Sequence, residues 1–198
     1  MLQAVPLLIT HLQAESTVEH TYAAHALERL FTMRGPNNST HITPTEMAPF
    51  TEQLLSNLFK ALALPGSEEN EYIMKAIMRS FSLLQEAMVP YIPTLIGQLT
   101  HKLLLVSKNP SKPHFNHYLF ESLCLSVRIT CKANPATVGS FEEALFPVFT
   151  EILQNDVQGA SLSHESDCHI HVDDVFIDNG DNSTPSPCVL FYRVSSIR

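Results

Sequence analysis

Apolar side chains recur every three or four positions along residues 3–156, the spacing that gathers them on one face of an α-helix. This pattern predicts a succession of helices of roughly 15–20 residues each, with their polar faces toward solvent. The predicted apolar faces are Val18, Tyr22, Ala26, Leu30 and Met33; Phe50, Leu54, Leu58 and Leu62; Ile73, Ile77, Phe81, Leu84 and Met88; Ile92, Leu95, Leu99, Leu103 and Val106; and Phe115, Leu119, Leu123 and Val127.

The prolines of this region recur at a regular interval. Pro6, Pro49, Pro93 and Pro147 each follow a small or apolar residue and precede a leucine by six positions. The first two intervals are 43 and 44 residues, within the roughly 40–47 typical of HEAT and armadillo repeats, and the third is 54. A proline costs little in the first turn of a helix, because its missing N–H would have no intrahelical partner there. Deeper in, a proline bends the helix, so the interval predicts a proline at one repeated point of the first helix of each pair.

The helical faces and the prolines together predict an all-α protein. First and second helices alternate along residues 1–158, giving about three and a half antiparallel pairs of a HEAT-repeat α-solenoid. The alternative is a compact helical bundle without superhelical stacking, but a bundle has no need of a proline at this period.

Helix boundaries are predicted from short polar motifs. Residues 16–19, 43–46 and 140–143 have the S/T-x-x-E form of a capping box, in which the hydroxyl and the carboxylate each satisfy a free backbone N–H. Proline-containing breaks at residues 65–67, 109–111 and 134–135 are expected to separate helices.

Residues 159–198 lose the helical period and are rich in Ser, Asp, His and Asn, so we expect a divergent, largely disordered C-terminal tail. Possible zinc-ligating residues of this tail are His164, Cys168, His169, His171, Asp173, Asp174 and Cys188. A structural zinc site needs four ligands, usually as two spaced pairs, whereas the first Cys and His here are adjacent and the second Cys lies 20 positions on. We therefore expect neither a metal site nor a cofactor.

The composition narrows the function. A formal net charge of −8 argues against a nucleic-acid partner, because phosphate binding draws on clustered Lys and Arg. Four cysteines are too few for a disulfide framework, and Cys124 and Cys131 lie on one helical face, so we expect buried free thiols in a reducing compartment. The N-terminus has no signal-peptide pattern, and the longest apolar run is far short of the ~20 residues that span a bilayer. These features predict a protein of the cytosol or nucleus.

Catalytic motifs are missing from the sequence: there is no G-x-S-x-G, phosphate loop or H-E-x-x-H. Glu68, Glu69 and Glu71 stand at a helix start, where carboxylates favour the positive end of the helix dipole. His114 and His117 lack a third metal ligand. We expect no enzymatic activity and no small-molecule substrate.

Several long stretches resemble a known family. The sequence is similar to the central HEAT-repeat region of the importin-alpha re-exporters (the cellular apoptosis susceptibility exportins), a family of the importin-beta superfamily. The stretches that carry the resemblance are residues 22–37 (YAAHALERLFTMRGPN), 70–85 (NEYIMKAIMRSFSLLQ), 106–118 (VSKNPSKPHFNHY), 128–136 (RITCKANPA) and 141–146 (FEEALF).

The resemblance implies a piece of a nuclear transport receptor that holds importin-alpha together with Ran-GTP and moves between nucleus and cytoplasm. Partners of that kind would present acidic surface, so basic residues are the candidates for contact. The candidate partner-binding residues are Arg79, Lys102, Lys108, Lys112, Arg128 and Lys132. The alternative is a truncated isoform that is inert or dominant-negative, because the family's amino-terminal repeats are missing and residues 159–198 depart from its pattern.

Overall fold

The computed structural model describes residues 2–35, 39–108 and 111–159, and only the backbone of residues 152–159. It divides into two units, residues 1–138 and residues 139–198. The longer helices of the first unit are α1 (Ala4–His11), α2 (Thr17–Thr32), α4 (Thr51–Leu62), α5 (Glu71–Leu84), α6 (Ile92–Ser107) and α7 (Pro113–Ala133). Its short elements are α3 (Pro44–Met47) and the 3-10 turns η1 (Ala48–Phe50), η2 (Gln85–Met88) and η3 (Pro135–Thr137). The described part of the second unit is α8 (Val138–Gly159) from its second residue onward. The zinc-ligand candidates of the tail lie outside the described residues.

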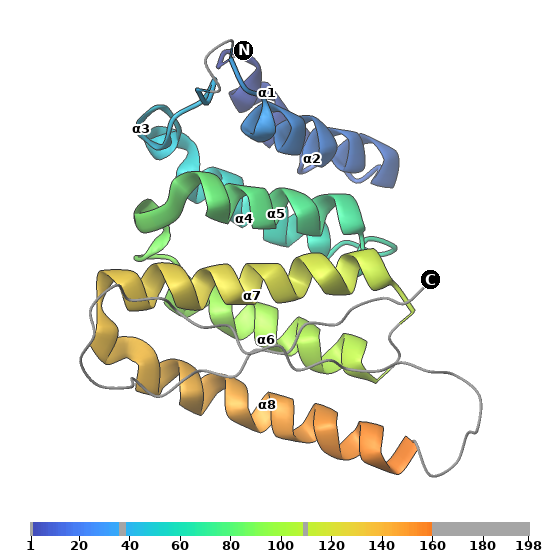
Figure 1. Ribbon diagram of the computed structural model, residues 1–198. Coiled ribbons are helices and arrows are strands. Elements are labelled where there is room, and N and C mark those ends of the chain that lie inside the picture. Colours follow the sequence, from blue (N-terminus) through green and yellow to red (C-terminus); the bar gives the residue numbers. More distant parts are fainter. Residues whose placement is uncertain (1, 36–38, 109–110, 160–198) are drawn as a thin grey trace. The chain divides into compact units, whose positions relative to one another are not determined.

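The first unit is a stack of helix pairs. Helix α1 packs on α2, α4 on α5 and α6 on α7. The second helices of these pairs lie side by side, with α5 between α2 and α7 (Figure 1), and α5 packs extensively against both. Since all regular structure in the described residues is helical, apart from one isolated bridge between Arg34 and Thr40, the all-α HEAT-type prediction is confirmed.

Helix α5 is the most enclosed element of this stack. Ile73, Ile77 and Phe81 are fully buried, and the Asn70 side chain caps the helix by accepting from the backbone N–H groups of Tyr72 and Ile73. The apolar faces predicted for this helix and for α6 and α7 are buried, as are the leucines predicted for α4. Hydrophobic spacing was therefore sufficient to orient these helices.

The predicted face of α2 is wrong. Val18 and Tyr22 are 64% and 70% exposed, while Ala24 and Leu27 are fully buried. The buried face also carries His20, which would not be chosen from hydropathy. Its Nδ1 lies 2.9 Å from the carbonyl of Ala14 and its Nε2 lies 2.7 Å from Oγ of Ser67. Because these partners satisfy the imidazole, a polar position can lie inside the stack.

The predicted capping boxes have three different outcomes. The box at Thr43 is confirmed, since its N–H donates to Glu46 at 2.9 Å and its hydroxyl accepts from the Glu46 N–H. The hydrogen bond from the Thr43 backbone holds the pKa of Glu46 below its usual value. The box at Ser16 is wrong: that side chain makes no cap, and the Glu19 carboxylate instead lies 2.6 Å from Nδ1 of His11. Ser140 is the third residue of α8, within its first turn, rather than the residue before the helix where a cap would lie.

The four prolines lie at different depths in the helical segments. Pro6 and Pro93 lie in the first turns of α1 and α6, and Pro49 lies in the 3-10 turn that precedes α4. Pro147, in contrast, lies inside α8. Glu142, Glu143, Ala144 and Leu145 before it are good helix formers, and the helix continues through the proline at the cost of one backbone donor. Helices α1, α4 and α5, of 8, 12 and 14 residues, are also shorter than predicted.

Two side chains link successive first helices by covering the carbonyls at a helix end. Nδ2 of Asn57, on α4, donates to the carbonyl of Ile9 at 2.8 Å, and its Oδ1 accepts from Gln13 at 2.9 Å. Lys102, on α6, donates to the carbonyl of Leu62 at 3.4 Å and to that of Glu68 at 2.9 Å. Asn57 lies eight residues after Pro49, and Lys102 lies nine residues after Pro93. In each repeat, the first helix therefore carries a side chain that caps the C-terminal end of the first helix of the preceding repeat.

Replacing Asn57 tests the importance of this link. Asn57→Ala removes one buried and one partly buried hydrogen bond and leaves the Ile9 carbonyl without its donor, so the free energy of unfolding should fall by about 1–3 kcal/mol in urea unfolding. Gln53→Ala, at an exposed position of the same helix, is the matched control and should change the free energy by no more than about 0.5 kcal/mol. Equal losses in the two variants would contradict the capping role.

Candidate protein-binding surface

The Lys102 side chain lies against the end of α4 rather than on an open surface. Its side chain is half-buried, and its ammonium group is occupied by the carbonyls of Leu62 and Glu68. Burial lowers the pKa of this lysine, while Glu68 and Glu69 oppose that effect. Lys102 is therefore committed to the end of α4.

Arg79 belongs to a cluster around a buried carboxylate. Glu28, on α2, is 2% exposed, and its Oε1 lies 3.6 Å from Nζ of Lys75 and 3.7 Å from Nε of Arg79. Nδ1 of His25 lies 3.8 Å from the other oxygen, Oε2. That oxygen, Arg79 Nε and His25 Nδ1 make no hydrogen bond in the described structure. One carboxylate thus serves two cations and joins α2 to α5.

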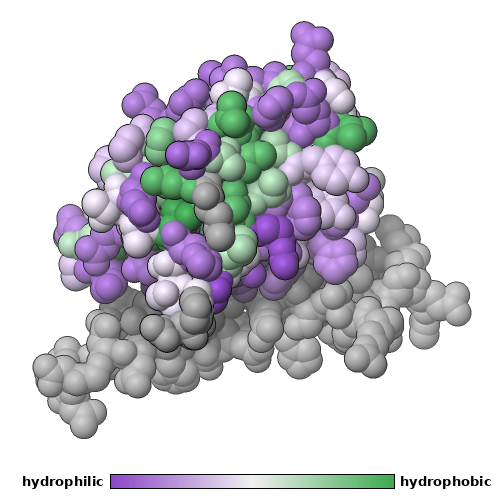
Figure 2. All heavy atoms as spheres, turned by 90° about the horizontal axis from the view of Figure 1, so that it is seen from above, coloured by the Kyte–Doolittle hydropathy of each residue, from purple (hydrophilic) through white to green (hydrophobic). Residues whose placement is uncertain are grey.

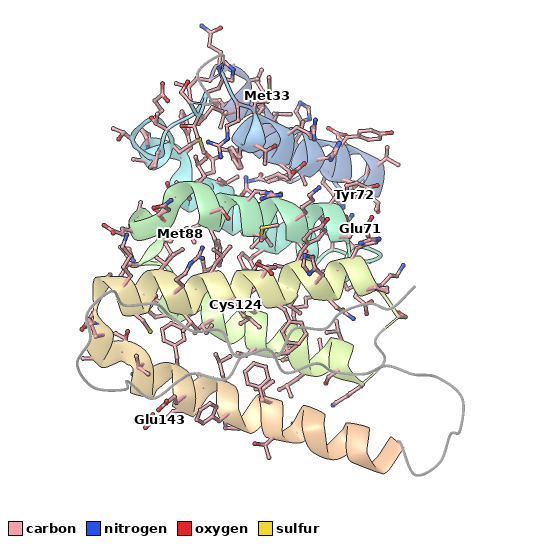
Figure 3. All side chains as sticks on the ribbon, viewed as in Figure 1. Met33, Glu71, Tyr72, Met88, Cys124 and Glu143 are labelled. Carbon is pink, nitrogen blue, oxygen red and sulfur yellow. The ribbon has the colours of Figure 1, made fainter. Side chains whose placement is uncertain are left out.

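Aromatic rings extend this cluster across three helices. The rings of Tyr72 and His25 meet edge to face with centroids 5.4 Å apart, and Tyr72 lies at the N-terminal end of α5 (Figure 3). Nζ of Lys75 lies 5.6 Å from the ring centroid of Tyr118 on α7, within the range of a cation–π contact. Since Tyr72 is 42% exposed, the layer formed by α2, α5 and α7 presents both aromatic and basic groups to solvent.

Arg128 and Lys132 lie together on α7, one turn apart. Nζ of Lys132 is 3.4 Å from Oε1 of Glu86, in a pair whose side chains are 70% and 66% exposed. Arg128 is exposed and forms no ion pair within the described residues. The two cations border a groove of about 250 Å³ between the end of α5 and α7.

Lys108 and Lys112 are exposed in the connection between α6 and α7. Lys112 stands just before α7, whereas Arg128 lies sixteen residues farther along, a separation of roughly 24 Å at 1.5 Å per residue. The six candidate cations therefore do not converge on one site. Two are held within the stack, two lie in a loop and two border the groove.

Lys75, Glu28 and the two tyrosines of the cluster, Tyr72 and Tyr118, were not predicted from the sequence. Tyr72, Lys75 and Arg79 have helical spacing and share one face of α5, which is a signal that could have been used. Nothing in the sequence indicated that Glu28 is buried, because this depends on how α2 packs against α5.

The helical cysteines differ from their prediction in burial. Cys124 and Cys131 are free thiols, as expected, but both are half-buried rather than buried. Burial is the main cause that raises the pKa of Cys124 to about 11, with Glu121 adding to the effect and Arg128 opposing it. At neutral pH the Cys124 sulfur is therefore a thiol, which is a poor nucleophile.

An apolar surface lies on the first helix pair. Leu7 on α1, Val18 and Tyr22 on α2, and Met33 directly after α2 are exposed. Figure 2 looks onto this end of the first unit and shows hydrophobic residues gathered there. Within the described ranges no helix is long and apolar enough to cross a membrane, and no three His, Cys, Asp or Glu side chains form a possible metal site.

A stack of helix pairs with basic and aromatic side chains along one exposed helix layer defines an α-solenoid of the class that binds other proteins. A protein-family profile described as "CAS/CSE protein, C-terminus" matches residues 28–161. Similar proteins named exportin-2 are found in Pagrus major, at 93% identity, Danio rerio, at 90%, and Homo sapiens, at 80%. Each matches over 158 residues, which is 80% of this chain and 16% of the relative. The chain therefore belongs to the CAS/CSE family, and it spans about a sixth of the length of these curated relatives.

The contributions of the buried Glu28 carboxylate and the exposed Glu86 carboxylate to stability can be compared directly. Glu28→Gln keeps the shape of the side chain but leaves Lys75 and Arg79 without their counter-charge, so the free energy of unfolding should fall by about 1–3 kcal/mol. Glu86→Gln removes an exposed ion pair and should cost no more than about 0.5 kcal/mol. Urea unfolding of the two variants measures the difference. A Glu28→Gln loss no larger than that of Glu86→Gln would show that the cluster does not hold α2 to α5.

Proposed function

We propose that this chain acts by protein–protein binding, as part of a nuclear transport receptor that exports importin-alpha in complex with Ran-GTP. The single observation that carries the proposal is the 80–93% identity to proteins named exportin-2. Importin-alpha and Ran-GTP are named as partners because the sequence resembles the importin-alpha re-exporters. On this proposal the protein works in both nucleus and cytoplasm and performs no catalysis of its own.

The helix layer of α2, α5 and α7 is the part of the first unit best suited to a partner. It carries exposed Tyr22 and Tyr72 together with the exposed Arg128 and Lys132 of α7. Tyrosine and arginine are enriched at the energetically important positions of protein interfaces, and basic side chains favour a partner with acidic surface. A solenoid offers such a layer as an extended surface, so one pair of helices supplies only part of the contact.

The proposal is tested by binding of the 198-residue chain to importin-alpha in the presence of Ran-GTP or Ran-GDP, measured by calorimetry. We expect binding that is at least about tenfold tighter with Ran-GTP, which corresponds to about 1.4 kcal/mol of coupling between the two partners. Circular dichroism and light scattering establish beforehand that the chain is helical and monodisperse. If the folded chain binds importin-alpha with neither Ran-GTP nor Ran-GDP, the proposal is wrong and the inert truncated isoform is favoured.

A further inference from the structure

The groove between α5 and α7 is built from both apolar and charged side chains, and we name it the α5–α7 groove. The residues that line it are Phe81, Ser82, Gln85, Glu86, Leu125, Arg128, Ile129 and Lys132. Phe81, Leu125 and Ile129 are buried and provide an apolar floor, whereas the charged side chains are exposed at the border. With a volume of about 250 Å³, the groove has room for a large apolar side chain but not for a whole helix.

The groove carries positive charge that the fold does not use. Lys75 and Arg79 face the buried Glu28, and Lys102 caps the end of α4, so these cations are occupied. Arg128, in contrast, has no carboxylate partner in the described ranges, and Lys132 pairs only with the exposed Glu86. An exposed pair of this kind contributes at most about 1 kcal/mol. An incoming carboxylate can therefore replace Glu86 at little cost.

The spacing of the two cations indicates the form of the ligand. Arg128 and Lys132 are four residues apart on α7, so they share a face and are separated by roughly 6 Å along the helix axis. Two carboxylates at positions i and i+4 of another helix have the same separation. Arginine can also bind a carboxylate through two parallel hydrogen bonds, which favours a fixed geometry over diffuse attraction.

A strained residue lies at the end of the groove. Gln85 has φ +45° and ψ −118°, a backbone conformation that side chains rarely adopt and that suits glycine at the first central position of a type II′ turn. Its N–H still donates to the carbonyl of Phe81. Such a conformation costs about 1–3 kcal/mol and persists only where the surrounding packing enforces it. The shape of this end of the groove is therefore held by the fold rather than set by the ligand.

From these features we propose that the α5–α7 groove binds an acidic amphipathic helix of a protein partner. One large apolar side chain of that helix packs between Leu125 and Ile129, and two carboxylates one turn apart bind Arg128 and Lys132. This inference deepens the proposed function and rests on it, because it assigns part of the partner contact to one groove. It also separates the six candidate cations: the pair on α7 contacts the partner directly, and Lys108 and Lys112 are dispensable for that contact.

Charge reversal at the groove is the first test. In the 198-residue chain, Arg128→Glu with Lys132→Glu should weaken binding of importin-alpha with Ran-GTP at least tenfold, because both ligand carboxylates then face like charges. The matched control, Lys108→Glu with Lys112→Glu, makes the same change in net charge at exposed positions and should alter the dissociation constant less than twofold. Thermal unfolding of both variants checks that each remains folded. Equal weakening in the two double variants, or none in the groove variant, would overturn the proposal.

A second experiment tests ligand binding by the α5–α7 groove even if the unaltered chain binds neither importin-alpha nor Ran. The probe is a stapled helical peptide with a leucine and two glutamates one turn apart on the same face, and its control has glutamines in place of the glutamates. By fluorescence anisotropy, the glutamate peptide should bind the unaltered chain at least fivefold more tightly, and the Arg128→Glu, Lys132→Glu variant should lose that preference. Equal binding of the two peptides to the unaltered chain would refute the groove, independently of any result with importin-alpha or Ran.

Discussion

The first unit depends on the burial of α5 between two neighbouring helices. A helix in the middle of a stack has to be apolar on both flanks, and nine of the fourteen residues of α5 are buried. Ile73, Ile77 and Phe81 form the centre of this packing. Since each fully buried aliphatic or aromatic side chain contributes about 1.5–3 kcal/mol, this helix supplies a large part of the stabilising free energy of the unit. The outer helices can then be shorter or carry polar groups on their packed faces.

Polar contacts add specificity to that apolar packing and also consume potential binding groups. Asn57 on α4 caps the end of α1, and Lys102 on α6 caps the end of α4. Glu28 forms ion pairs with Lys75 and Arg79. A basic residue on a solenoid surface is therefore not a free contact by default, because the stack itself needs donors at helix ends and counter-charges between helices. The cations that remain available are those at the margins of the packed layer.

Much of the fold could be predicted from the sequence, because helix formation and capping depend on residues that are close together in the chain. Alternating helix pairs, the buried faces of four helices and the cap at Thr43 follow from spacing and capping chemistry within a few residues. Two of the failures involve contacts outside the local sequence: His20 is buried on α2 because Ser67 satisfies it, and Glu19 pairs with His11, eight residues earlier, instead of capping its helix. The same limit applies to the candidate site, where only the structure distinguishes Lys102 as a helix cap from Arg128 at a groove.

Hydrogen–deuterium exchange, followed by mass spectrometry in the native state, measures the central claim that α5 organises the stack. Amides of a fully packed element exchange only through global unfolding, whereas those of a short outer helix exchange through local opening. Peptides from the middle of α5, around residues 73–81, should therefore be the slowest to exchange, and peptides from α1 should be among the fastest. Protection in α5 no greater than that in α1 would contradict this account of the fold.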